Sequence, residues 1–367
     1  MKFTVSQSSL TQAIGVVMKG VASASTLPIL SGVLVKAQDG ILEFQTSNYT
    51  ISIRHRIAAH VEEEGEMVIP CKMLSNITKT LPDAPVTFEL SERQVLIGCE
   101  KSSFRLNTLD ANDFPEFPAY AIERAVELPT DVLSEMVGRV WRVTSTDKAR
   151  PILGGVHMKV ENNTVRLVAT DSFRLAVCDT QVETSTLEGS FELNVPADAF
   201  NDALSIMASQ ATIMIGATDT QVVFEAGNTT YVSRRIEGVY PNYKQLIPDS
   251  CVTSVKIDVA AFNAALKRVA VIASANPAVK FEIDVENGQM GLSSISNDQD
   301  LAQETIDVEA EGESGTIAFN YHYIFGCLNA LSKEKEITLE LKSYSQAGIF
   351  KSYDKINYLY LVMPVRI

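Results

Sequence analysis

Three copies of one pattern run through this chain, and their spacing constrains its fold more than any other feature. Each copy opens on a proline, passes through an apolar stretch and reaches a polar two-residue turn. The prolines are Pro28, Pro151 and Pro277, which lie 123 and 126 positions apart. The turns are Asp39-Gly40, Asn162-Asn163 and Asn287-Gly288, which lie 123 and 125 positions apart. A third landmark follows at Pro70, Pro196 and Asn320, 126 and 124 positions apart.

A period of about 125 residues is the length of a single domain and far exceeds that of a solenoid repeat. The repeat therefore predicts three linked domains of one fold, over residues 1–122, 126–249 and 252–367. The rigid stretch from Phe114 to Pro118 marks the approach to the first linker.

Composition places the chain among globular proteins. Of its 367 residues, 46% are hydrophobic and 21% are charged, and no apolar run approaches the roughly 18 residues that cross a bilayer. The first residues are too polar for a signal peptide. Five cysteines, at 71, 99, 178, 251 and 327, form no CxxC pair. We therefore expect buried thiols in a reducing cytoplasm, without disulfides or zinc.

Apolar residues at helical spacing predict two helices in each copy. The expected helices cover 6–19, 71–81, 130–142, 197–208, 258–272 and 320–332. About eight short strands per copy, joined by frequent hairpin turns, predict mainly antiparallel sheets. The fold class is α+β, with the helices collected on one face of the sheets.

The net charge of −14 argues against a protein that grips nucleic acid through its phosphates. Any function on DNA must therefore hold the duplex in another way.

Four separated motifs resemble the bacterial β sliding clamp family, the processivity subunit of DNA polymerase III. The motifs are Thr26-Leu27-Pro28-Ile29-Leu30, the run from Val168 to Val177, Tyr240-Pro241-Asn242-Tyr243, and the C-terminal run from Leu361 to Ile367. The resemblance covers the whole chain. It implies three tandem clamp domains in a head-to-tail homodimer, closed into a ring whose hole is lined by helices. It also implies a non-catalytic protein without a cofactor or metal.

Such a ring encircles double-stranded DNA and holds it by topology, which answers the objection from charge. It tethers the replicative polymerase, the clamp loader and other clamp-binding proteins. The six expected helices carry seven basic and five acidic residues, a net +2 against −16 for the rest of the chain. We expect the DNA-facing residues to be Lys19, Lys72, Lys79, Arg139, Arg142, Lys148, Arg150, Lys267 and Arg268.

The chain departs from the family pattern at two places that bear on DNA. Ala24 and Ser25 stand before the Thr-Leu-Pro motif, where members often have a basic residue. The expected helix 197–208 carries Asp198 and Asp202 and no basic residue.

The resemblance further implies a groove between the second and third domains that binds a partner peptide similar to Gln-Leu-x-Leu-Phe. The matching positions are Leu153, Thr170, Ser172, Phe173, Arg174, Leu175, Pro241, Leu246, Asn320, Tyr323, Gly348, Leu361, Met363 and Val365. Five of them, at 153, 175, 246, 361 and 363, are apolar and suit a Leu-Phe anchor, since methionine adapts to varied partners. We also expect Asn320 to bond the peptide backbone and the stem of Arg174 to close the rim. Phe173 stands where many members have histidine, and Gln245 where many have a basic residue.

The dimer contact would join the first domain of one protomer to the third of the other. The candidates are Phe104 and Leu106 on a strand edge, with Val271 and Ile272 opposite.

Two other classes of function compete. An enzyme could use Asp171 beside Thr170, or Asp110 and Asp113, as catalytic carboxylates. However, the four histidines are not paired at metal-ligand spacing, and the chain has neither a GxSxG nor a Walker A motif. A β-rich peptide-binding scaffold that does not act on DNA would also explain the acidic surface.

Overall fold

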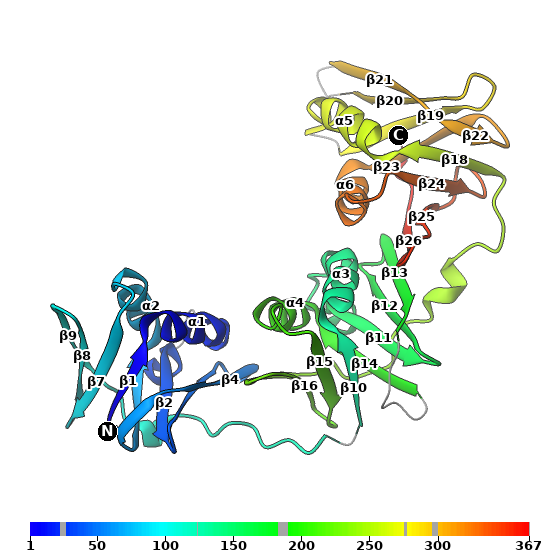
Figure 1. Cartoon of the computed structure of the whole chain (residues 1–367). Coiled ribbons are helices and arrows are strands. Elements are labelled where there is room, and N and C mark those ends of the chain that lie inside the picture. The colour runs from blue at the N-terminus through cyan, green and yellow to red at the C-terminus, as the bar shows by residue number, and fades with distance from the viewer. Residues whose placement is uncertain (23–26, 123, 183–189, 275–276, 296–299, 367) are drawn as a thin grey trace. The chain divides into compact units, whose positions relative to one another are not determined.

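The computed structural model describes residues 1–22, 27–122, 124–182, 190–274, 277–295 and 300–366 (Figure 1). The motif residues Ala24, Ser25, Thr26, Asn276 and Ile367 lie outside these ranges. The chain forms two compact units. The first comprises Met1–Asp131 and Asp202–Arg235, and the second comprises Val132–Asn201 and Ile236–Ile367.

The six expected helices are confirmed, with slightly tighter bounds. They are α1 (Gln7–Val17), α2 (Cys71–Thr80), α3 (Thr130–Val140), α4 (Ala197–Ile206), α5 (Val259–Ala270) and α6 (Tyr321–Ala330). Short polar side chains fix three of the starts by accepting a backbone N–H, which would otherwise lack a partner. The side chain of Ser6 accepts from the backbone N–H of Ser9, that of Asp258 from Ala261, and that of Asn320 from His322. No helix in the described ranges is long and apolar enough to cross a membrane.

The first unit contains two sheets. In spatial order, one consists of β5 (His60–Glu63), β1 (Lys2–Ser6), β7 (Pro85–Ser91), β8 (Gln94–Cys99) and β9 (Ser102–Asn107). The other consists of β10 (Arg124–Pro129), β15 (Thr212–Ala217), β16 (Gln221–Ala226), β17 (Thr229–Arg234), β4 (Ile51–Ala58), β3 (Ile41–Ser47), β2 (Gly32–Gln38) and β6 (Gly65–Pro70).

The second unit also contains two sheets. The larger consists of β14 (Ser190–Pro196), β11 (Gly155–Glu161), β12 (Thr164–Thr170), β13 (Arg174–Gln181), β26 (Asn357–Val362), β25 (Gly348–Ser352), β24 (Glu336–Leu341), β18 (Thr253–Asp258) and β22 (Glu309–Glu311). The smaller consists of β21 (Leu301–Asp307), β20 (Gln289–Ile295), β19 (Ala278–Asp284) and β23 (Gly315–Asn320). Every pairing between these strands is antiparallel, as the hairpin turns predict.

Two strand pairings join neighbouring copies of the repeat. Strand β17 of the second copy pairs with β4 of the first, from Thr229 opposite His55 to Ser233 opposite Ile51. Strand β13 of the second copy pairs with β26 of the third. The middle copy therefore gives half of its strands to each compact unit. The domain ranges read from the repeat remain a prediction, because the compact units divide the chain differently.

Apolar side chains at helical spacing bury one face of each helix. In α1 the buried residues are Leu10, Ala13, Ile14 and Val17, and this helix packs beside α2 and against β4 (Figure 1). In the third copy, Phe262 of α5 lies 5.8 Å from Phe281 and 6.2 Å from Phe350, measured between ring centroids. Fully burying such a side chain stabilises the fold by about 1.5–3 kcal/mol.

A buried hydroxyl closes the end of α1. Thr46 on β3 donates to the carbonyl oxygen of Val17 at 2.6 Å. The third copy repeats this contact, because Ser294 on β20 donates to the carbonyl oxygen of Val269 at 2.7 Å. The recurrence extends the sequence repeat to single hydrogen bonds.

We predict that Thr46→Val lowers the free energy of unfolding of the first unit by about 1–2 kcal/mol, because the carbonyl of Val17 loses its buried donor. Urea unfolding followed by circular dichroism measures the change. Thr220→Val, at an exposed turn position of the same unit, is the matched control and should change little. An equal loss in both variants would contradict the role of the hydroxyl.

Candidate functional site

The junction of β13 and β26 builds an apolar floor from two copies of the repeat. Leu175 lies opposite Leu361, and Leu361 lies opposite Ile349 on the next strand. The buried cluster at this junction comprises Val168, Leu175, Val177, Tyr240, Ile349 and Leu361. Partly buried residues pack around it, namely Ile152, Tyr243, Ile247, Ala347 and Leu359.

Large apolar side chains remain exposed next to this floor. The exposed fractions are 56% for Phe173, 56% for Leu246 and 46% for Met363. Met363 is fixed there because its backbone N–H donates to the carbonyl oxygen of Phe173 at 2.9 Å. Val365 is held similarly by the carbonyl oxygen of Ala318 at 2.9 Å. Grouped apolar exposure of this kind marks interaction sites on proteins.

The loop between β12 and β13 is fixed by its own side chains. The Asp171 carboxylate accepts the backbone N–H groups of Phe173 and Arg174 at 2.9 and 3.0 Å. Thr170 donates its hydroxyl to the carbonyl oxygen of Arg174 at 2.7 Å. Ser172 adopts a left-handed φ of 79° and accepts from Arg150 at 2.7 Å. Asp171 and Thr170 therefore act in loop structure, which removes the geometric basis for a catalytic carboxylate there.

Arg174 is partly buried, and its guanidinium is engaged within the protein, whereas its stem was expected to close the rim of the groove. Its guanidinium donates to the Asp171 carboxylate at 2.9 Å and to the carbonyl oxygen of Arg142 at 2.9 Å. It also lies 4.7 Å from the centre of the Tyr323 ring. Burial raises the pKa of the Tyr323 hydroxyl above its ordinary value. The sequence analysis placed Arg174 at the groove but did not predict that its guanidinium is engaged by Asp171 and Tyr323.

Four other expected groove residues differ in their contacts and their burial. Asn320 uses its side-chain oxygen to cap α6, at 3.0 Å from the backbone nitrogen of His322, so this oxygen is already engaged. A Cβ on Gly348 would lie 2.6 Å from the ring of Phe319, so the glycine serves close packing. Leu153 is buried outside the floor cluster, and Pro241 is exposed.

Matches to known proteins cover nearly the whole chain. Residues 1–118, 127–242 and 244–366 match the N-terminal, central and C-terminal domains of the DNA polymerase III beta subunit. The chain belongs to the beta sliding clamp family. It is 32% identical to the beta sliding clamp of Synechococcus elongatus over 100% of both chains. It is therefore a non-catalytic sliding clamp of DNA replication, built from three tandem clamp domains.

Solved clamp structures share this fold. The DNA polymerase sliding clamp of Bacillus subtilis is 30% identical, with a TM-score of 0.92 over 100% of this chain and 99% of that one. The DNA polymerase III beta subunit of Thermotoga maritima is 29% identical, with a TM-score of 0.92 and the same coverage.

Four basic residues that we expected to face DNA in this clamp form ion pairs, and for one of them the expectation is wrong. Arg139 is buried and forms ion pairs with Glu135 and Glu334, each at 2.8 Å, so it is not available to DNA. Its hydrogen bond also lowers the pKa of the Glu135 carboxyl below the ordinary value. The other three are exposed but already paired: Lys19 with Asp202 at 2.8 Å, Arg150 with Asp147 at 3.0 Å and Arg268 with Glu304 at 2.6 Å.

The remaining five expected DNA-facing residues are exposed and form no ion pair within the described ranges. They are Lys72, Lys79, Arg142, Lys148 and Lys267. Their free charges fit the expectation, which remains a prediction. Three or more side chains that could hold a metal ion do not meet anywhere in the part of the clamp that the structure describes.

Sequence reasoning missed four of the six residues of the groove floor. Val168, Val177, Tyr240 and Ile349 belong to the cluster but were not among the expected groove residues. A period of two along the strands could have found some of them, since Val177 shares the face of Leu175 and Leu359 that of Leu361. The missing information was the register between β13 and β26.

We predict that Arg139→Ala lowers the free energy of unfolding of the second unit by about 3–5 kcal/mol, because the half-buried Glu334 loses its cation and Glu135 keeps only Lys333, at 3.6 Å. Urea unfolding measures the loss. Arg142→Ala, three residues away and exposed, is the control and should stay within about 0.5 kcal/mol. Equal stability of the two variants would show that Arg139 is not structural.

Proposed function

We propose that this clamp binds short peptides of replication and repair proteins in the groove at the β13–β26 junction. The observation that carries this proposal is an apolar floor with Phe173, Leu246 and Met363 exposed beside it. A peptide carrying leucine and phenylalanine would cover these side chains and remove apolar surface from water. The flexible thioether side chain of Met363 suits a site that accepts several partners in turn.

We further propose that two copies close into a ring around duplex DNA in the cytoplasm. A ring holds DNA by enclosure and must slide, so it needs few lasting phosphate contacts. The unpaired cations Lys72, Lys79, Arg142, Lys148 and Lys267 would supply weak, sequence-independent attraction. The overall charge of −14 would discourage DNA from binding elsewhere on the surface.

The two ends of the repeat offer unlike surfaces for this closure. Strand β9 lies at the edge of its sheet in the first copy, and β21 lies at the edge of its sheet in the third. Open edges present unpaired backbone groups that favour pairing with another strand. Phe104 and Leu106 are partly buried on β9, whereas Val271 is 73% exposed and is followed by the partly buried Ile272. Arg105 on β9 and Asp307 on β21 have opposite charges, which favours a head-to-tail contact.

We predict that Met363→Glu weakens binding of a labelled Gln-Leu-Ser-Leu-Phe peptide at least tenfold, which corresponds to about 1.4 kcal/mol. The added charge would be desolvated against the apolar floor. Fluorescence anisotropy with the full chain measures the affinity. Ile41→Glu, an exposed apolar site on β3, is the control and should bind normally. Unchanged binding by Met363→Glu would contradict the groove.

We predict that Val271→Glu shifts the protein from dimer to monomer and abolishes its selective retention on circular over linear DNA after loading. Analytical ultracentrifugation and gel filtration of loaded DNA measure the two effects. Val239→Glu introduces the same charge at another exposed valine and should leave both properties intact. Equal retention of the unmodified protein on circular and linear DNA would contradict the ring.

A further inference from the structure

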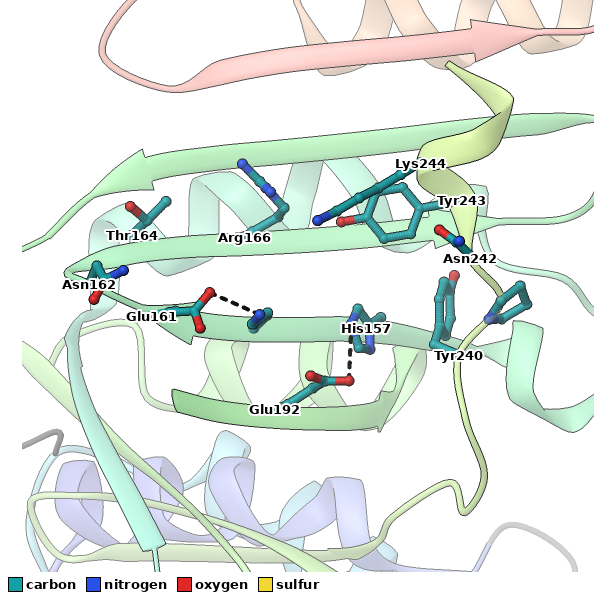
Figure 2. Close-up of a pocket in the computed structure, with 12 residues that line it drawn as sticks. His157, Glu161, Asn162, Thr164, Arg166, Glu192, Tyr240, Asn242, Tyr243 and Lys244 are labelled. Carbon is teal, nitrogen blue, oxygen red and sulfur yellow. Dashed lines mark ion pairs between the residues drawn. The ribbon is translucent and has the colours of Figure 1, made fainter. Parts of the chain in front are cut away.

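A second cleft lies on the same sheet as the groove floor, beyond the turn Tyr243–Leu246 (Figure 2). It consists of two adjoining hollows of about 350 and 260 Å³ that share Arg166, Tyr243 and Lys244 as lining residues. The cleft adjoins the groove floor, because Tyr240 and Val177 belong to both and the expected groove residue Pro241 also lines the cleft. Its charged residues were not among the expected groove residues.

Strand geometry sets the distance between the groove and this cleft. Residues 175, 177 and 179 of β13 point to one face of the sheet, because side chains alternate along a strand. Leu175 and Val177 belong to the groove floor, and Val177 and Asp179 line the cleft, so the two sites adjoin at Val177 and Asp179 lies farther along the cleft. Four residues of extended strand span about 13 Å. An extended peptide anchored over Leu175 therefore reaches the cleft with about four further residues.

Most charges in the cleft are already satisfied. Lys159 pairs with Glu161 at 2.9 Å, and Arg166 pairs with Asp179 at 3.3 Å. Lys244 is exposed and has no ion-pair partner within the described ranges. Figure 2 shows its side chain projecting on the same side of the strands as Arg166 and Tyr243. Glu192 also lines the cleft, and its carboxylate faces the His157 ring nitrogen at 3.7 Å. With one free ammonium group and this carboxylate nearby, the cleft suits a single carboxylate placed at Lys244 and not a polyanion.

The walls of the cleft are rigid and partly apolar. His157 stacks on Tyr240 with 4.8 Å between ring centroids, and its Nδ1 lies 2.8 Å from the side-chain oxygen of Asn194. The smaller hollow is lined by Val177, Ile247, Leu359 and Tyr353, of which Tyr353 is 67% exposed. An apolar side chain entering this hollow would be covered on several sides.

We propose that the cleft is a second docking site, which binds one acidic and one apolar residue in the segment that flanks a groove-bound partner peptide. This inference rests on the proposed peptide groove and adds a requirement on the sequence beside the anchor. The partner's carboxylate pairs with Lys244, and the apolar side chain packs against Tyr353 and Leu359. Partners that carry such a flank bind more tightly than the anchor alone.

The test compares five labelled peptides by fluorescence anisotropy with the full chain. One is Gln-Leu-Ser-Leu-Phe alone. Two others carry a six-residue extension at the N-terminal or the C-terminal end, with leucine and aspartate at the fourth and fifth places from the anchor. Two controls carry Gly-Ser extensions of equal length at either end. We expect one acidic-apolar extension to tighten binding about fivefold to tenfold over its Gly-Ser counterpart, with the gain shrinking as salt rises.

Variants of the chain identify the residues responsible. Lys244→Glu should remove most of the gain while the short peptide binds as before, and Tyr353→Ser should reduce the gain independently. Lys342→Glu, at another exposed lysine of the same unit, is the matched control and should keep the full gain.

The test separates a failure of the second docking site from a failure of the peptide groove. If the short peptide binds but neither extension adds affinity, or the gain survives Lys244→Glu, the second docking site is wrong and the groove stands. If no peptide binds, the groove itself is wrong, and the inference fails with it.

Discussion

The pairing of β13 with β26 is the interaction on which the partner site depends. It sets Leu175 of the second copy opposite Leu361 of the third, so neither copy has the apolar floor alone. A slip of one residue in this register would turn every floor side chain to the other face of the sheet. The backbone hydrogen bonds between β13 and β26 thus determine which side chains form the apolar floor of the groove.

The buried Arg139 and the partly buried Arg174 reinforce this junction. Arg139 connects α3 to Glu334, beyond α6, and Arg174 connects β13 to Tyr323 on α6. A buried charge is stable only when it is paired, and a carboxylate meets each of these cations here. Two copies of the repeat held only by apolar contact could shift against each other at this junction. These ion pairs favour one position of the second copy against the third.

The sequence predicted the threefold repeat and the six helices, because turns, prolines and helical periodicity act over a few residues. The location of the groove followed from the resemblance to the clamp family and remains a prediction. It could not separate Arg139 from Arg142, since both stand on one short helical stretch and their surroundings come from elsewhere in the chain. The two-residue period places Val177 on the face of Leu175, but β13 is buried on both faces in its centre, so the period alone does not show which face meets a partner. A continuous apolar run carries no signal of which face meets a partner.

The two free sheet edges, β9 and β21, have a consequence for assembly. Unlike surfaces that bind head to tail can close into a ring or grow into an open filament, and the bend within each subunit decides between them. Inside the chain, the β4–β17 and β13–β26 pairings join each copy of the repeat to the next, at strands remote in sequence from these edges. Residues that touch no neighbouring subunit can therefore influence which assembly forms.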